Sequence, residues 1–166
     1  MILTFPRYIG DIDALDPLPP SELNETEKPL REMRVLLVDD EPIVLRATQR
    51  LLGTLGARVI AVSNGHEALA VFRKRLPEID LVLLDLVMPE MDGTVVLKQL
   101  REINPDVPAL IASGFTPEPE KLSVLKSEIP RFEFLKKPYK AGRLVKAVGA
   151  LGILHAGADV SGEKIS

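Results

Sequence analysis

Short apolar runs alternate along this chain with longer segments in which apolar residues recur at helical spacing. Three runs are wholly apolar, at residues 35–38, 81–84 and 109–112. Continuous apolar runs of this length are typical of strands that are buried on both faces of a parallel sheet. Two less apolar runs, at residues 58–62 and 132–135, predict strands nearer the edges of that sheet.

The segments between the strands carry the spacing of amphipathic helices. They lie at residues 42–55, 67–75, 93–103, 117–127 and 139–154. Five strands that alternate with five helices predict a doubly wound α/β domain. We expect a five-stranded parallel sheet with helices on both faces, and if its strand order is 2-1-3-4-5, the first and third strands are neighbours.

Two of these helices have recognisable start signals. Pro42 suits a first helical turn, and Asp40 is placed to cap that helix. Asp92 is placed to cap the helix that begins at Gly93. In the first helix, the residues predicted to face the core are Ile43, Ala47, Leu51 and Leu55.

The two ends of the chain differ in composition from the middle. Residues 1–32 hold five of the fourteen prolines and carry seven acidic against three basic side chains. This composition predicts an acidic, proline-rich linker or the end of an upstream domain. The α/β domain then spans residues 33–154, and the small, polar residues 155–166 form a flexible tail.

Composition excludes several classes of protein. The chain has no cysteine and two histidines, which excludes disulfides, zinc ribbons and iron–sulfur clusters. Its net charge of −3 argues against a protein that binds nucleic acid directly. No apolar run approaches the roughly 18 residues of a membrane span, so we expect a cytoplasmic protein without membrane contact.

Polar residues gather where the predicted strands end. Asp39 and Asp40 follow the first strand, Asp85 the third, Ser113 the fourth and Lys137 the fifth. Ligands of such sheets bind at these carboxyl ends. Three carboxylates in one place repel each other unless a cation lies among them, and Mg²⁺, or Mn²⁺ as a substitute, fits this role. With a lysine and a hydroxyl added, the pattern predicts a phosphoryl site whose nucleophile is Asp85.

Each of these residues has a simpler interpretation when it is taken alone. An aspartate after a strand is often a helix cap, which applies to Asp39 and Asp40. Asp85 alone reads as a turn residue, Lys137 alone as a solvated lysine, and Ser113 alone as part of a loop. The placement of all of them at strand ends, in the right order, favours a shared site.

The same segments resemble the receiver domains of bacterial two-component response regulators. The resemblance runs from residue 34 to the last predicted helix, with the flavodoxin-like receiver fold that this implies. The matching segments are VLLVDDE (35–41), NGHEAL (64–69), DLVLLDLVMPEMDG (80–93), SGF (113–115) and FLKKPY (134–139). It implies a signalling module that catalyses its own phosphorylation from a phosphohistidine, and its own slow dephosphorylation.

The resemblance also implies the residues of the active site. Asp85 is the phosphoacceptor, Asp40 binds Mg²⁺ directly and Asp39 binds it mostly through water. The backbone carbonyl of Val87 is the third protein ligand of the metal. Lys137 is the active-site lysine, because it directly precedes proline in a bond that is usually cis in this family. No other cofactor-binding residue is expected.

Two further positions match the conformational switch of the family. Ser113 moves toward the aspartyl phosphate, and the ring of Phe134 then turns inward, as a shift between two existing states.

Two other positions depart from common patterns of the family. Val87 and Phe115 lack the polar groups that position a hydrolytic water, so they are expected to lengthen the lifetime of the phosphoryl group.

The resemblance names a class of partner as well. A histidine kinase or a histidine phosphotransfer protein is the expected phosphodonor, and a homodimer through the last two helices and the fifth strand is a further expectation. Residues 3–8, LTFPRY, look like the last strand of the ATP-binding domain of a histidine kinase. This favours the carboxy-terminal receiver of a hybrid sensor kinase, while a stand-alone receiver stays open.

Two other functions compete with a phosphoacceptor. A phosphatase of the haloacid-dehalogenase type also uses an aspartate nucleophile at a strand end, but it needs a second acid two residues later, where this chain has Val87. A receiver-like interaction module that takes no phosphate usually lacks an acid or the lysine. Asp39, Asp40, Asp85 and Lys137 are all present in this chain.

Overall fold

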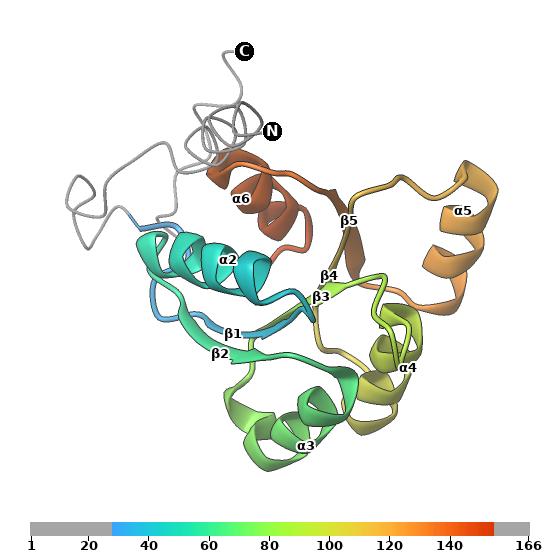
Figure 1. The fold of residues 1–166 in the computed structure, drawn as a ribbon, viewed down its shortest axis with the longest axis horizontal. Coiled ribbons are helices and arrows are strands. Elements are labelled where there is room, and N and C mark those ends of the chain that lie inside the picture. Colours follow the sequence, from blue (N-terminus) through green and yellow to red (C-terminus); the bar gives the residue numbers. More distant parts are fainter. Residues whose placement is uncertain (1–27, 155–166) are drawn as a thin grey trace, which may run out of the picture.

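Five strands and five α-helices alternate along residues 28–154, the part of the chain that this computed structural model describes (Figure 1). The predicted tail at 155–166, the segment 3–8 and most of the predicted linker lie outside the described residues. The elements are β1 (Arg34–Val38), α2 (Pro42–Thr54), β2 (Arg58–Val62), α3 (Gly65–Arg75), the 3₁₀ turn η3 (Leu76–Glu78), β3 (Leu81–Asp85), α4 (Gly93–Ile103), β4 (Ala109–Ser113), α5 (Pro119–Glu128), β5 (Phe132–Lys136) and α6 (Ala141–Ala150).

The sheet is parallel throughout and has the strand order β2-β1-β3-β4-β5. This confirms the predicted topology. Every residue of β3 and β4 is buried, whereas the two edge strands β2 and β5 are only partly buried. The difference explains why the central strands read as continuous apolar runs and the edge strands do not.

Helices cover both faces of the sheet, and each face has its own apolar core. Helices α2 and α6 lie on one face, and α3, α4 and α5 lie on the other (Figure 1). Leu52 of α2 is fully buried in the core on the side of α2 and α6. Phe72 of α3 is fully buried in the core on the side of α3, α4 and α5. No helix of residues 28–154 has the length and apolar character to cross a membrane.

The predicted inner face of α2 is confirmed at its end and wrong at its start. Leu55 is buried and Leu51 packs against the core as predicted, whereas Ile43 is 77% exposed and Ala47 is exposed. Thr48 and Leu52, which were not predicted, are buried. The helix carries two overlapping stripes at helical spacing, and the sequence pattern alone does not choose between them. The buried stripe is the one whose leucines pack in the core that α2 shares with α6, so tertiary packing decides between the two.

Helix boundaries and caps differ in part from the predictions. Asp40 does not cap α2, since Glu41 occupies the cap position without a side-chain cap. Asp92 does cap α4, by accepting a hydrogen bond from the backbone N–H of Thr94 at 2.7 Å. The last helix, α6, is shorter than predicted at both ends, and Gly152 beyond its end has φ +73°, which favours glycine.

The packed unit begins before residue 33. Leu30 is fully buried in the core beneath α2 and α6, and its backbone N–H donates to the carbonyl of Leu55 at 2.9 Å. Gly56, whose φ is +98°, lies so close to Lys28 and Arg31 that a Cβ there would approach their atoms within 3.0 Å. Residues 28–32, placed by composition in the linker, therefore pack against the α/β domain.

Candidate functional site

Strand order brings three carboxylates together at the carboxyl edge of the sheet. Asp39 and Asp40 directly follow β1, and Asp85 ends the neighbouring strand β3. One oxygen of each carboxylate lies within 4.8 Å of the others. Asp39 and Asp85 are buried and Asp40 is half-buried, so this is a concentrated negative charge at a partly closed surface.

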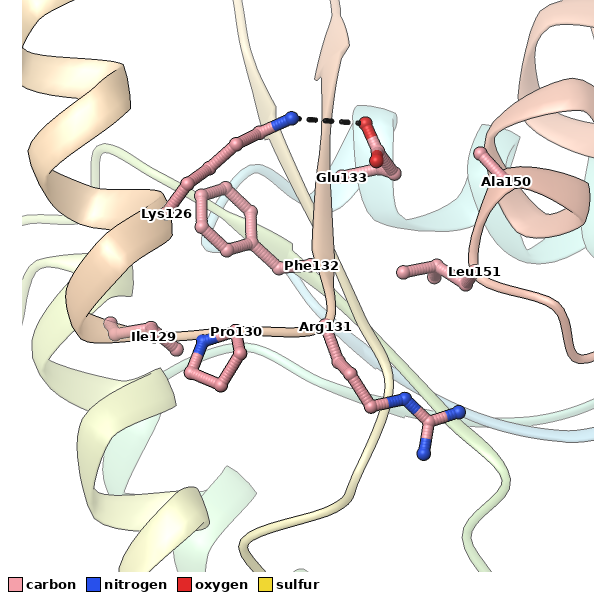
Figure 2. A pocket seen from close by; sticks show the side chains of 8 residues that line it. All are labelled: Lys126, Ile129, Pro130, Arg131, Phe132, Glu133, Ala150 and Leu151. Carbon is pink, nitrogen blue, oxygen red and sulfur yellow. Dashed lines mark hydrogen bonds and ion pairs between the residues drawn. The ribbon is translucent and has the colours of Figure 1, made fainter.

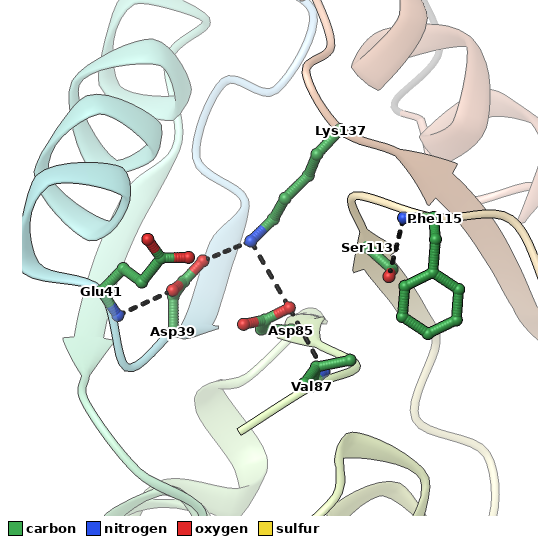
Figure 3. A network of polar contacts seen from close by, with 7 residues as sticks. All are labelled: Asp39, Glu41, Asp85, Val87, Ser113, Phe115 and Lys137. Carbon is green, nitrogen blue, oxygen red and sulfur yellow. Dashed lines mark hydrogen bonds and ion pairs between the residues drawn. The ribbon is translucent and has the colours of Figure 1, made fainter. Parts of the chain in front are cut away.

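A lysine that follows the edge strand β5 reaches this carboxylate cluster (Figure 3). Lys137 follows β5, two strands away from β3, and its Nζ lies 2.8 Å from Asp39 Oδ2 and 3.4 Å from Asp85 Oδ1. Its backbone N–H donates to the carbonyl of Ser113 at 2.7 Å, and its bond to Pro138 is cis. The structure thus brings together the strand-end residues that the sequence singles out.

Burial and neighbouring charges set the protonation states of Asp85 and Lys137. The pKa of Asp85 is raised to about 6, first by burial, which Lys137 opposes and the charge of Asp39 reinforces. The pKa of Lys137 is raised: burial lowers it, but the hydrogen bond and charge of Asp39, and then the charge of Asp85, outweigh that effect. At neutral pH both groups are therefore ionised, and Asp85 presents a nucleophilic carboxylate.

This pKa predicts how stability depends on pH when no metal is added. Between pH 3.8 and about 6 the folded protein keeps the proton of Asp85 while the unfolded chain loses it. Raising the pH through this range therefore destabilises the fold through this group. We expect Asp85→Asn to unfold at higher urea concentration than wild type at pH 7, and at a similar concentration near pH 4, in buffers that contain a chelator.

The comparison with Asp85→Asn isolates one carboxyl, because every other titrating group is common to both proteins. Urea unfolding at four pH values between 4 and 7 gives the difference in free energy of unfolding directly. A difference that stays constant across this range would contradict the raised pKa.

The remaining predicted residues differ in how deeply they are buried. Ser113 is 1% exposed, and its Oγ accepts a hydrogen bond from the backbone N–H of Phe115 at 3.3 Å. Phe115 and Val87 are more than half exposed, and in Figure 3 both lie on the side of Asp85 that is away from Asp39. Phe134 is half-buried and packs against the core under α3, α4 and α5.

Gly93 is a residue of the site that sequence reasoning used only as a helix start. Its backbone N–H donates to the carbonyl of Leu86, and a Cβ at this position would lie 2.2 Å from the carbonyl oxygen of Asp85. Only glycine lets the start of α4 pack this tightly on the end of β3. The close packing holds the loop that presents Val87, whose backbone N–H donates to Asp85 Oδ1 at 3.4 Å.

The donor set of the acid cluster fits a hard dication. Carboxylate oxygens are ligands that Mg²⁺ accepts while it keeps several waters. Lys137 offsets one of the three negative charges, so two remain for a cation to neutralise. Within residues 28–154 the side chain of Asp40 makes no hydrogen bond or ion pair, which leaves its carboxylate available as a ligand.

Removal of the Asp40 charge should separate metal binding from the rest of the fold. We expect Mg²⁺ to raise the melting temperature of wild type and to raise that of Asp40→Asn far less, because a ligand that binds only the folded state stabilises it. Without metal, Asp40→Asn should melt above wild type, since one repelling charge is gone. Thermal melts with and without Mg²⁺ measure both effects.

Glu41→Gln is the matched control, because Glu41 is an exposed acid next to Asp40 and lies outside the cluster. It should melt like wild type and keep the full response to Mg²⁺. An intact Mg²⁺ response in Asp40→Asn would contradict the role of this carboxylate as a direct ligand.

Comparison with known proteins identifies a family model and relatives that match this chain. The family model of the response regulator receiver domain matches residues 35–149. Over 117 residues, or 69% of its length, the chain is 35% identical to the sensor kinase CckA of Brucella abortus, of which it covers 12%. The chain spans less than half of the length of the curated relatives it matches.

Solved structures share the fold. The chemotaxis protein CheY4 of Vibrio cholerae superposes with a TM-score of 0.65 at 27% identity, covering 72% of this chain and 98% of that one. The receiver domain of the histidine kinase CKI1 from Arabidopsis thaliana, complexed with Mg²⁺ and BeF₃⁻, superposes with a TM-score of 0.63 at 25% identity. That match covers 74% of this chain and 91% of the other.

Proposed function

Because the chain belongs to the response regulator receiver domain family of two-component systems, we propose that Asp85 accepts a phosphoryl group from a phosphohistidine. The convergence of Asp39, Asp40, Asp85 and Lys137 at one edge of the sheet supports this proposal most directly. Intact-mass measurement after incubation with acetyl phosphate and Mg²⁺ tests it. We expect one phosphoryl adduct per chain, and none without donor.

The proposed reaction is an in-line displacement at phosphorus. A carboxylate oxygen of Asp85 attacks, the phosphorus–nitrogen bond to the imidazole of the donor breaks, and an acyl phosphate forms. The pKa of about 6 keeps this carboxylate ionised at neutral pH. Lys137, 3.4 Å from the attacking group, is placed to pair with the phosphoryl oxygens as they arrive.

We place the metal on Asp40, Asp85 and the backbone carbonyl of Val87, with Asp39 acting mostly through water. Mg²⁺ at this position supplies positive charge that lets a phosphoryl group approach three carboxylates. The related CKI1 receiver was solved with Mg²⁺ and BeF₃⁻, which supports the proposal. Mn²⁺ is the proposed substitute, because it favours the same oxygen ligands.

The proposed response to phosphorylation is a shift in the Ser113 region. The Ser113 hydroxyl is buried, and it accepts the backbone N–H of Phe115 within its own loop. An aspartyl phosphate offers this hydroxyl a stronger, charged acceptor, so its movement toward Asp85 is favoured. Phe134 lies next to β4 in the register, paired with Ile111, and its half-buried ring would turn into the space that Ser113 leaves.

A homodimer through α5, β5 and α6 is a further part of the proposal. A hollow of about 340 Å³ lies between these elements, and its lining residues are drawn in Figure 2. Lys126 and Glu133 form an ion pair of 3.5 Å across it, and Phe132, Ile129 and Leu151 form its apolar part. Sedimentation of the unphosphorylated and phosphorylated protein measures this association.

A hybrid sensor kinase is the proposed origin of the chain, with residues 33–154 as its receiver. The similarity to the sensor kinase CckA and to the receiver domain of a hybrid histidine kinase of that name supports this. A histidine kinase or a histidine phosphotransfer protein is then the phosphodonor. The reading frame upstream of Met1 tests the proposal, since a kinase domain is expected there.

The phosphoryl group should be long-lived on this chain. Water attacks the phosphorus from the open side of the site, where a hydrogen-bonding side chain is needed to orient it. Val87 and Phe115, both more than half exposed at this opening, offer no such group. We expect an adduct that persists for many minutes after the donor is removed, and a shorter lifetime in Val87→Asn, as measured by decay of the phosphorylated mass.

Val87→Ile is the matched control, because it keeps an apolar, β-branched side chain and should leave the lifetime unchanged. Decay of wild type within seconds, or a Val87→Asn adduct as durable as that of wild type, would contradict this interpretation of the two positions.

A further inference from the structure

Helices α2 and α6 present exposed cations on the face of the sheet that they cover. Arg46 and Arg50 belong to α2, and Arg143 and Lys146 belong to α6; all four are exposed. Neither helix contains an aspartate or a glutamate. Because both helices pack in one apolar core on the same side of the sheet, their outer surfaces together form a basic face (Figure 1).

The four cations of the basic face have no acidic partner within residues 28–154. None of their side chains forms an ion pair there. The helices on the other side of the sheet differ, as the ion pair between Lys98 of α4 and Glu128 of α5 at 3.2 Å shows. Arg46 and Arg50 are four residues apart in a helix, a spacing at which like charges repel. The basic face therefore favours an anionic ligand.

A surface hollow of about 780 Å³ lies at the start of α6. Its lining includes Lys136, Lys140 and Arg143 and no acidic residue. Lys140 occupies the cap position of α6 and makes no side-chain cap, so the positive end of the helix dipole adds to the three cations. The basic face is thus concave at this end and suits acidic side chains.

The chain carries an acidic segment that is attached beside this face. Residues 11–27 contain six acidic residues and no basic one. Three residues further on, Leu30 is fully buried in the core that α2 and α6 share, and its backbone N–H donates to the carbonyl of Leu55 at 2.9 Å. The chain therefore enters the domain next to the end of α2, and the acidic segment directly precedes this point.

The length of the segment is sufficient to reach across the basic face. Helix α2 has 13 residues and is roughly 20 Å long, since a helix rises about 1.5 Å per residue. The 17 residues 11–27 can extend up to about 55 Å. A tethered segment acts at an effective concentration in the millimolar range, so that several weak surface ion pairs are enough to hold it.

We propose that residues 11–27 bind to the basic face of their own chain. Their carboxylates pair with the cations of α2 and α6, and the hollow at the start of α6 receives part of the segment. Lys136 and Pro138 line that hollow and are the chain neighbours of Lys137. The bound segment therefore lies beside the phosphoryl site and keeps the basic face from other acidic partners. The binding itself does not depend on the proposed function.

The first experiment locates the segment by nuclear magnetic resonance of the full chain. The chain has no cysteine, so Ser21→Cys provides a single attachment point for a nitroxide and leaves the charge of the segment unchanged. We expect the nitroxide to broaden the amide signals of Arg46, Arg143 and Lys146 and to leave those of α3 sharp. In about 1 M NaCl, where the Debye length is about 3 Å, this broadening should disappear.

A charge-neutral variant is the matched control, because it keeps the length of the tether. It carries Asp11→Asn, Asp13→Asn, Asp16→Asn, Glu22→Gln, Glu25→Gln and Glu27→Gln. Its broadening should match that of wild type in high salt, which is the contribution of the tether alone. A mixture of nitroxide-labelled chain with isotope-labelled chain that has no nitroxide shows whether the segment binds a second copy instead.

The second experiment measures protection of the lysines. The full chain is treated with a trace of acetic anhydride, and mass spectrometry gives the labelling of Lys140 and Lys146 relative to Lys74, which is exposed on α3. We expect this ratio to be about fivefold lower in wild type than in the charge-neutral variant, the size of effect that a few exposed ion pairs produce. High salt should remove the difference.

Equal broadening in wild type and the charge-neutral variant would overturn the proposal, as would an equal labelling ratio. Broadening that is as strong in the mixture as within one chain would also overturn it, because the occupant would then be a second copy. Both experiments use no phosphodonor. Failure of the chain to accept a phosphoryl group would contradict the proposed function and leave these results standing.

Discussion

Asp85→Asn should take up no phosphoryl group under conditions in which wild type is converted to a single adduct. The substitution keeps the size of the side chain but removes the nucleophilic oxygen and its charge. Asp39 is held by Lys137 at 2.8 Å, and its other oxygen accepts the backbone N–H of Glu41, so it is poorly placed to replace Asp85 as a nucleophile. Intact mass after incubation with acetyl phosphate and Mg²⁺ measures the adduct.

Asp92→Asn is the matched control for this experiment. Asp92 lies in the same loop but is exposed, and its role is to cap α4, which asparagine performs as well. It should be phosphorylated like wild type. Asp85 would not be the phosphoacceptor if an adduct formed equally in Asp85→Asn, and the dependence on a dication would be wrong if wild type reacted equally in chelator.

Lys137→Met should lower the rate of phosphorylation about 100- to 1,000-fold, the typical effect of removing one preorganised charge donor from a reaction site. Methionine keeps much of the length of the stem and removes the ammonium group. Two effects then act together: the incoming phosphoryl oxygens lose a partner, and Asp39 and Asp85 face each other without the cation that lies between them. Rates of adduct formation at fixed Mg²⁺ and donor concentration measure the change.

Lys136→Met is the matched control, because Lys136 precedes Lys137 and is exposed at the end of β5. Its substitution should change the rate less than twofold if small phosphodonors need no docking surface. An equal loss of phosphorylation rate in Lys137→Met and Lys136→Met would contradict the assignment of Lys137 as the active-site lysine. Such a result would show that the rate depends only on the total positive charge near the site.

Much of the architecture follows from local sequence. Each central strand is a run of four apolar residues that is followed directly by a polar one, as Val38 is followed by Asp39 and Leu84 by Asp85. Such a run is stable only when both faces of the strand are covered. In a parallel sheet, all of these ends lie on one edge. The meeting of Asp39, Asp40, Asp85 and Lys137 was therefore predictable from order and spacing alone.

Other features depended on contacts between distant segments. Apolar spacing in α2 fits two faces, and packing on the sheet decided which of them is buried. Leu30 lies in an acidic, proline-rich stretch, and composition averaged over such a window hides a single residue that inserts into the core.

By itself, the sequence determined the strands and the set of charged residues at the site, because burial on two faces and the polarity of strand ends leave a direct local pattern. The strand order came from the resemblance to receiver domains, and the structure confirms it. Only the tertiary structure decided the raised pKa of Asp85, since this depends on burial and on the charges of Lys137 and Asp39, which follow two other strands.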